Sequence, residues 1–451
     1  MKRWIVGLTL LTLTIGAVEL AAHMDSSVSE RALSALRRQS EPAIAELRAA
    51  GQPGVDAFVA ASENLIDRSK PEDVARFRAV LDRICRQRDC YASHLYWYTD
   101  LAQAEGAARA QGKPILSLRL LGNLDDELSC ANSRFFRTTL YANAKVAHTL
   151  HDQFVLHWSS ERPVPKVTVD FGDGRKICST VTGNSAHYLL DADGNPLDVL
   201  PGLYSPDAFL AQLTRLHNFA QQYARINPDA RDRMLREYHS NQFQQVARLR
   251  DRELTLASAL RPATPPVATP VASVPPAPMA SSAQATTLST ARDPWTVLQQ
   301  APAVRVDAIN IGSLSTSKGV YEVAILRDLG QTLAAVDDSQ WKRMAANHVN
   351  EVHFDAASIA LMQEKAPSFQ TRMLANLQRT VEEDTLRNEY DFHLRIHQWF
   401  GNGPRPASFQ ALNRRVYAEL FLTPASDPWL GLLQDDAFSA VAGGGVVTRS
   451  R

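Results

Sequence analysis

The chain has 451 residues, of which 45% are hydrophobic and 21% are charged. This balance is typical of a globular protein and excludes a fully disordered one, while the length predicts two or three domains. Lys plus Arg equals Asp plus Glu at 48 each, so no net field draws the chain to nucleic acid or to an anionic membrane surface. We therefore expect no nucleic-acid partner.

Residues 1–22 have the pattern of an export signal. Lys2 and Arg3 precede an apolar run over 4–18, a run shorter than the ~20 residues that a spanning helix needs. Glu19 and Leu20 stand where a cleavage motif would need small residues, so a cleaved signal and an uncleaved membrane anchor both stay open. Either way the pattern predicts a periplasmic or cell-envelope protein. We expect other envelope proteins as partners, and membrane contact only through this segment if it is uncleaved.

Four cysteines in an exported chain predict disulfides. Cys85 and Cys90 are close in sequence and can close a small loop after a helix. Cys130 and Cys178 then remain as a second pair, although three pairings are formally possible.

Residues 25–91 are predicted to be a helical N-terminal segment. Apolar residues recur there at spacings of three and four, for example over 74–84. Ser69-Lys70-Pro71-Glu72 is typical of a helix start, with proline in the first turn. Nothing in this segment points to catalysis.

Residues 92–216 alternate between helical and strand patterns, which predicts an α/β domain. Gly112 ends an Ala-rich helix, and the strand that follows is apolar throughout, as in the centre of a sheet. Two later hairpins turn at Gly172-Asp173-Gly174 and Asp193-Gly194-Asn195. The predicted order is helix 101–111, strand 115–121, helix 132–150, strand 153–158, hairpin 167–182, hairpin 187–200 and helix 208–216.

The remaining chain divides at a Pro-, Ala-, Ser- and Thr-rich stretch. A polar helical extension over 217–260 precedes this linker at 261–291, which cannot bury enough apolar surface to fold. A mainly α-helical domain at 292–440 and a flexible tail at 441–451 follow it. We expect the linker to separate two folded bodies.

The predicted C-terminal domain is rich in aromatic residues, which favours a helical core and leaves a partner-binding groove as the alternative. The aromatic set is Tyr390, Phe392, Trp399, Phe400, Tyr417, Phe421 and Trp429.

Residues 96–213 contain several short features whose order is informative. Gly112-Lys113-Pro114 enters an apolar strand, Cys130 follows that strand, and Tyr188-Leu189-Leu190 opens a hairpin. Pro201-Gly202-Leu203 and a final helix complete the series. In this order and spacing the segment resembles the thioredoxin superfamily. The resemblance implies an α/β thioredoxin-like fold with thiol–disulfide chemistry at Cys130, and we expect no cofactor.

The chain departs from the pattern of that family at three places. The Cys-x-x-Cys motif is replaced by Cys130-Ala131-Asn132-Ser133, so the resolving thiol is a hydroxyl. Ser185 stands where the family has a cis-proline, and the hairpin at 167–182 replaces an expected helix. Reversible oxidation of a vicinal dithiol is therefore excluded.

Cys130 could still act alone as an attacking thiol. A helix N-terminus favours the thiolate, and Ser133 could donate a hydrogen bond to it. The carboxylates at 125–127 disfavour the thiolate, an effect that Arg134 and Arg137 offset in part. The alternative is a buried or disulfide-bonded structural cysteine.

A second candidate site lies in the predicted C-terminal helices. His393 and His397 are four residues apart on one helix face, and Glu389 lies one turn earlier. Such a face can hold a metal ion, with His353 as a further ligand. The alternative is that Glu389 and His393 form a surface pair and that His397 packs beside Trp399. His157 and His187, at predicted strand ends, are expected to be structural.

Two functions follow from these observations. The first is an exported thioredoxin-like protein whose Cys130, at most a monothiol oxidoreductase or isomerase centre, acts on envelope proteins or traps them as a redox chaperone. The second is a thioredoxin-like scaffold without redox chemistry, which binds a partner together with the helical C-terminal domain. A metal-binding helical domain is a third, weaker hypothesis.

Overall fold

A computed structural model describes residues 30–63, 65–180, 183–259, 336–366 and 371–427. The predicted export segment, the linker, the tail and Trp429 lie outside these residues. Among the helices within them, none is both long enough and apolar enough to cross a membrane.

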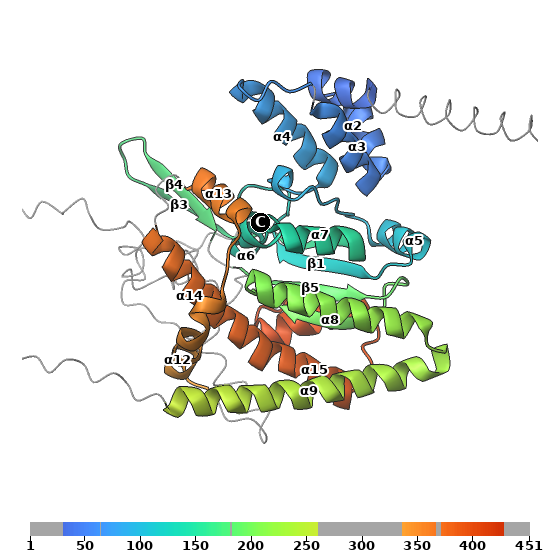
Figure 1. Cartoon of the computed structure of the whole chain (residues 1–451), viewed down its shortest axis with the longest axis vertical. Helices are drawn as coiled ribbons and strands as arrows, with labels where there is room; N and C mark the ends of the chain where they lie inside the picture. Colours follow the sequence, from blue (N-terminus) through green and yellow to red (C-terminus); the bar gives the residue numbers. More distant parts are fainter. Residues whose placement is uncertain (1–29, 64, 181–182, 260–335, 367–370, 428–451) are drawn as a thin grey trace, which may run out of the picture.

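The N-terminal segment is helical, as predicted, and has a small core of its own. Its helices are α2 (Glu41–Ala49), α3 (Gln52–Ser62) and α4 (Pro71–Cys85), which lie together at the top of Figure 1. Pro71 starts α4, as the sequence indicated. A disulfide joins Cys85 at the end of α4 to Cys90 in the short helix η1 (Cys90–Ala92).

A four-stranded mixed sheet forms the centre of the molecule, with the order β2-β1-β5-β6. Strand β1 pairs in parallel with β2 and antiparallel with β5, and β6 pairs antiparallel with β5. The strands are β1 (Ile115–Leu121), β2 (Val155–Arg162), β5 (Ser185–Leu190) and β6 (Pro196–Pro201).

Local sequence signals explain several boundaries. The helix α5 (Leu101–Gln111) begins after Asp100, whose side chain accepts a hydrogen bond from the backbone N–H of Gln103. It ends at Gly112, where a φ of 64° suits a residue without a Cβ. Every residue of β1 is buried, which matches its uninterrupted apolar pattern. The predicted helix end at Gly112 and the predicted buried strand are confirmed.

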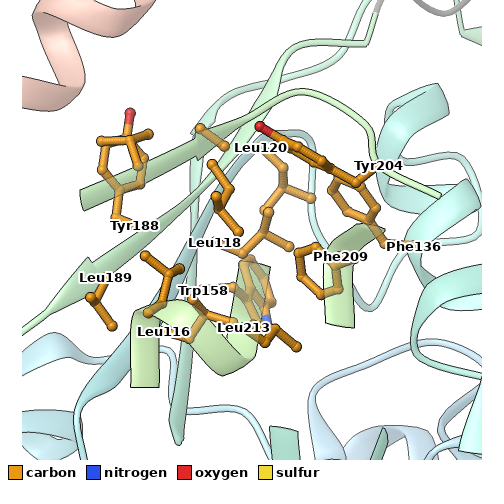
Figure 2. Close-up of a cluster of buried hydrophobic side chains, with 14 of the residues drawn as sticks. Leu116, Leu118, Leu120, Phe136, Trp158, Tyr188, Leu189, Tyr204, Phe209 and Leu213 are labelled. Carbon is orange, nitrogen blue, oxygen red and sulfur yellow. The ribbon is translucent and has the colours of Figure 1, made fainter. Parts of the chain in front are cut away.

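One face of the sheet is covered by helices close to it in sequence. These are α6 (Ala131–Phe135), the π-helix η2 (Phe136–Leu140), α7 (Ala144–Gln153) and α8 (Pro206–Arg225). Figure 2 shows leucines of β1 gathered with aromatic residues of η2 and α8. The packed side chains include Leu116, Leu118, Leu120, Phe136 and Phe209.

The connection from β2 to β5 places no helix on the other face. It is the predicted hairpin, formed by β3 (Lys166–Asp170) and β4 (Lys176–Thr180) as a separate two-stranded sheet. The side chains of β1 and β5 that point to this other face therefore need another covering element.

Two C-terminal elements supply that cover, the helix α16 (Phe409–Arg415) and the π-helix η7 (Val416–Leu420). The Phe409 ring packs on Tyr188 of β5 with ring centroids 5.0 Å apart. The Arg119 guanidinium of β1 lies 4.8 Å from the same ring. The Tyr188 hydroxyl donates to Asn413 Oδ1 at 2.9 Å. Residues more than 200 positions apart thus complete the second layer of the sheet.

The expectation of two separate folded bodies is therefore wrong for the described part of the C-terminal region. One hydrophobic core contains the sheet, α8 and the C-terminal helices together. The physical reason is the uncovered sheet face, which the C-terminal helices bury. The expected aromatic core is present, since Phe392, Trp399, Phe400, Tyr417 and Phe421 are all buried.

The long polar extension lies along the C-terminal helices. Helix α9 (Pro228–Ala259) packs against α15 (Leu394–Asn402) near the bottom of Figure 1. The π-helix η6 (Asn388–His393) leads into α15 and contacts β6. The other C-terminal elements are α12 (Asp338–His348), η5 (Val349–Glu351), α13 (Ala356–Lys365) and α14 (Thr371–Arg387).

Candidate functional site

Cys130 stands at the start of α6, as the sequence indicated, and its side chain is sealed from solvent. The residue is 0% exposed, as is Ser133. The Ser133 hydroxyl donates to the Cys130 backbone carbonyl at 2.9 Å and also bonds Ser129. Its hydrogen bonds therefore serve the helix start, and the thiol has no path to a reagent in this conformation.

The segment that faces the start of α6 is closely packed. Asn132 Nδ2 donates to the hydroxyl of Ser185, the residue at the expected cis-proline position, at 3.0 Å. A Cβ at Gly183 would lie 2.8 Å from Asn132 Oδ1, so glycine permits this close approach. Arg134 donates to Thr180 Oγ1 at 2.8 Å. These contacts join the start of α6 to Thr180, Gly183 and Ser185.

The charged residues near Cys130 are held by other partners. Asp125 pairs with Arg86 at 3.3 Å, and Glu127 pairs with Arg88 at 2.8 Å. Asp126 accepts from Asn123. Arg137 is buried and pairs with Asp89 at 2.9 Å, and Lys365 of α13 joins this pair from the C-terminal region. The charges around α6 thus tie three parts of the chain together.

Cys130 and Cys178 are free thiols in the structure, so the expected bridge between them is not formed. Cys178 is exposed on β4, opposite Thr168 of β3. Because the Cys130 side chain is sealed inside the core, the two sulfurs occupy different environments.

His157 and His187 have the structural role expected of them. Their imidazoles bond neighbouring hydroxyls, with His157 Nδ1 at 2.7 Å from Ser117 Oγ and His187 Nε2 at 2.7 Å from Tyr141 Oη. Burial lowers the pKa of each histidine to about 3. Both are neutral at physiological pH, and they are buried on opposite faces of the sheet.

A buried cluster of polar side chains lies where β6 meets the C-terminal helices. Asp198 of β6, His393 of η6 and His397 of α15 are each 0% exposed. Each offers a potential metal-ligand atom, and these atoms all lie within 4.8 Å of one another. His393 Nε2 lies 2.9 Å from Asp198 Oδ1. Of the residues that the structure describes, this is the group whose donor atoms could hold a metal ion.

A second layer of hydrogen bonds orients this cluster. His239 of α9 has its Nε2 at 2.8 Å from the Leu197 carbonyl and its Nδ1 at 2.8 Å from His397 Nδ1. The Asp198 carboxylate accepts from the Val199 backbone N–H at 2.7 Å and from the Tyr238 hydroxyl at 3.2 Å. The cluster is thus fixed by residues from β6, α9 and α15.

The protonation states follow from burial and from the neighbouring charges. Burial alone would raise the pKa of Asp198, but His393, with His397 and His239 nearby, lowers that pKa below its ordinary range. Burial, as the largest effect, lowers the pKa of His239 to about 4 and that of His397 well below its ordinary value. At neutral pH Asp198 is therefore a carboxylate, and His239 and His397 are neutral imidazoles. These are the forms in which such side chains bind metals.

The structure unites only part of the metal set that the sequence indicated. His393 and His397 lie together, but Glu389 accepts from Gln212 at 3.3 Å, and His353 is exposed in the segment between η5 and α13. Asp198 takes their place. The sequence did carry a signal for it, because Asp198 is the one acidic residue in the apolar strand Leu197–Leu200.

Comparison with protein-family models, curated proteins and solved structures found no match.

Proposed function

We propose that this chain is an exported, thioredoxin-like scaffold that binds envelope proteins and performs no thiol–disulfide exchange at Cys130. The observation that carries the proposal is the complete burial of Cys130. Thiol exchange needs a thiolate that reaches a disulfide sulfur. The buried Cys130 thiol cannot reach one, and Ser133 stands where the motif would have its second cysteine. The periplasm or cell envelope is the proposed location, on the strength of the N-terminal sequence pattern.

The strand order supports the thioredoxin-like part of the proposal. A parallel pair, β1 and β2, is connected through helices α6 and α7, and an antiparallel hairpin, β5 and β6, leads into α8. This is the arrangement that the sequence resemblance implies. The hairpin of β3 and β4 replaces one helix of the pattern, and α16 with η7 covers the face left open.

The N-terminal helices supply a surface suited to a binding role. A cavity of about 360 Å³ lies against α3 and α4. Apolar and aromatic side chains form much of its lining, namely Val59, Ile66, Val74, Phe77 and Tyr91. An apolar pocket of this kind is a usual feature of a site for a small ligand or for a side chain of a partner.

The test compares the full chain with Cys130→Ser in an insulin-reduction assay with dithiothreitol as the reductant. We expect the parent chain and Cys130→Ser to give the same rate, because the Cys130 thiol cannot reach a disulfide. The matched control is Cys178→Ser, which removes the exposed thiol. Activity in the parent chain that is lost in Cys130→Ser and kept in Cys178→Ser would overturn the scaffold proposal in favour of a monothiol enzyme.

A further inference from the structure

We infer that Asp198, His393 and His397 bind a divalent transition-metal ion, with Zn²⁺ as the best match, and that this ion fastens the C-terminal helices to the sheet. The inference is independent of Cys130 and of the scaffold proposal. It rests on the ligand atoms, on their unmet hydrogen bonds and on the places of the three residues in the chain.

Two ring nitrogens in the cluster have no hydrogen-bond partner within the described part of the chain. Both imidazoles are fully buried, and neither His393 Nδ1 nor His397 Nε2 has a hydrogen-bond partner among the residues that the structure describes. A buried polar atom without a partner destabilises the fold, because it has lost its hydrogen bonds to water. Coordination of a metal ion by an unpartnered ring nitrogen would remove that cost for that nitrogen.

A hydrogen bond with a neighbouring histidine orients one of the proposed ligands. Metal-bound histidines usually engage their other ring nitrogen in a hydrogen bond, which fixes the tautomer. His397 Nδ1 lies 2.8 Å from His239 Nδ1 while its Nε2 stays without a partner. The His239 Nε2 in turn bonds the Leu197 carbonyl. His239 is therefore a positioning residue, which presents the Nε2 lone pair of His397.

The ligand types select the class of metal. Two imidazoles and one carboxylate form a nitrogen and oxygen set of the kind that binds Zn²⁺. Zn–ligand distances of roughly 2.0–2.2 Å place tetrahedral ligand atoms about 3.3 Å apart. The potential ligand atoms lie within 4.8 Å of one another, so small side-chain rotations close the site.

The proposed ligands come from distant parts of the chain. Asp198 belongs to β6, and His393 lies 195 positions later in the chain, beyond the linker. An ion held by both would join the α/β core to the C-terminal helices. The free energy of metal binding would then contribute to folding. The site thus has a structural purpose even though all three residues are buried.

The experiment uses the full chain, unfolded in a chelator and refolded with or without Zn²⁺. Bound zinc is measured by elemental analysis after gel filtration, and the melting temperature is measured in the same samples. We expect about one zinc per chain and a higher melting temperature in the zinc-loaded protein. A refolded parent chain that contains no zinc and melts identically in both conditions would overturn the inference.

Variants identify the ligands. Asp198→Asn and His397→Ala should each abolish stoichiometric zinc binding, and His239→Gln should weaken zinc binding about 10- to 100-fold. Matched controls are His353→Ala, an exposed histidine, and Glu389→Gln, which tests the ligand suggested by sequence spacing. Both controls should retain zinc. Circular dichroism checks that each variant folds. If His397→Ala does not fold, the test uses Asp198→Asn, which keeps the side-chain shape. Zinc retained by folded Asp198→Asn and His397→Ala would contradict the assignment.

Discussion

Phe409→Ala is expected to lower the free energy of unfolding by about 3–5 kcal/mol, the usual range for removal of a buried phenylalanine. Phe409 is 4% exposed and is the aromatic contact of α16 with the sheet. Its ring packs on Tyr188 and lies under the guanidinium of Arg119. Without the ring, a cavity opens between the C-terminal helices and the strands β1 and β5.

Urea unfolding followed by circular dichroism measures this effect. The matched control is Phe171→Ala, because Phe171 is 43% exposed at the turn of the β3–β4 hairpin. We expect the control to change the unfolding free energy by less than about 0.5 kcal/mol. Equal effects of the two substitutions would mean that α16 does not cover the sheet, and the shared core would have to be abandoned.

Glu382→Gln is expected to stabilise the protein at high pH and to leave its stability nearly unchanged at low pH. Glu382 of α14 is 6% exposed. Burial, as the largest effect, raises its pKa from 4.5 to about 7, and His348 offsets part of this while Glu351 and Glu389 add to it. The folded chain therefore holds this proton more tightly than the unfolded chain does, and stability falls as the pH rises from 4.5 through 7. Above pH 7 the whole cost of the buried carboxylate is present.

Unfolding curves at pH 4.5 and pH 8 test this sign. The glutamine variant should be more stable than the parent by about 1–3 kcal/mol at pH 8, since one pKa unit corresponds to about 1.4 kcal/mol. Glu237→Gln is the control, because its side chain is 66% exposed in a pair on α9, and it should show little change at either pH. A Glu382→Gln variant that is less stable than the parent at pH 8 would show that the carboxylate makes a favourable contact.

Much of the sheet could be predicted because its signals are local. Gly112 and the apolar run of β1 lie close together in the chain. The hairpin of β3 and β4 follows in the same way from the glycines in its turn. Each of these features needs only neighbouring residues, and the structure has them at or near the predicted positions.

The cover of the second sheet face could not be predicted, because it depends on contacts across the linker. Tyr188 and Asn413 are 225 positions apart, and no periodicity in either segment points to the other. The same limit applies to the cluster. The spacing of His393 and His397 is visible on one helix, but Asp198 and His239 join them only through the tertiary fold. The burial of Cys130 depends on the same packing, so its place at a helix start gave no measure of its accessibility.

The most direct test of the account is the reactivity of the two free thiols in the folded full chain. A soluble maleimide is added to the native protein and to the protein in denaturant without reductant, and the labelled cysteines are identified by peptide mass spectrometry. The account predicts that Cys178 is labelled in the native protein and that Cys130 is labelled only after unfolding, because Cys130 is 0% exposed and Cys178 is exposed. Native labelling of Cys130 at a rate comparable to that of Cys178 would contradict it, and thiol chemistry would again be open to this protein.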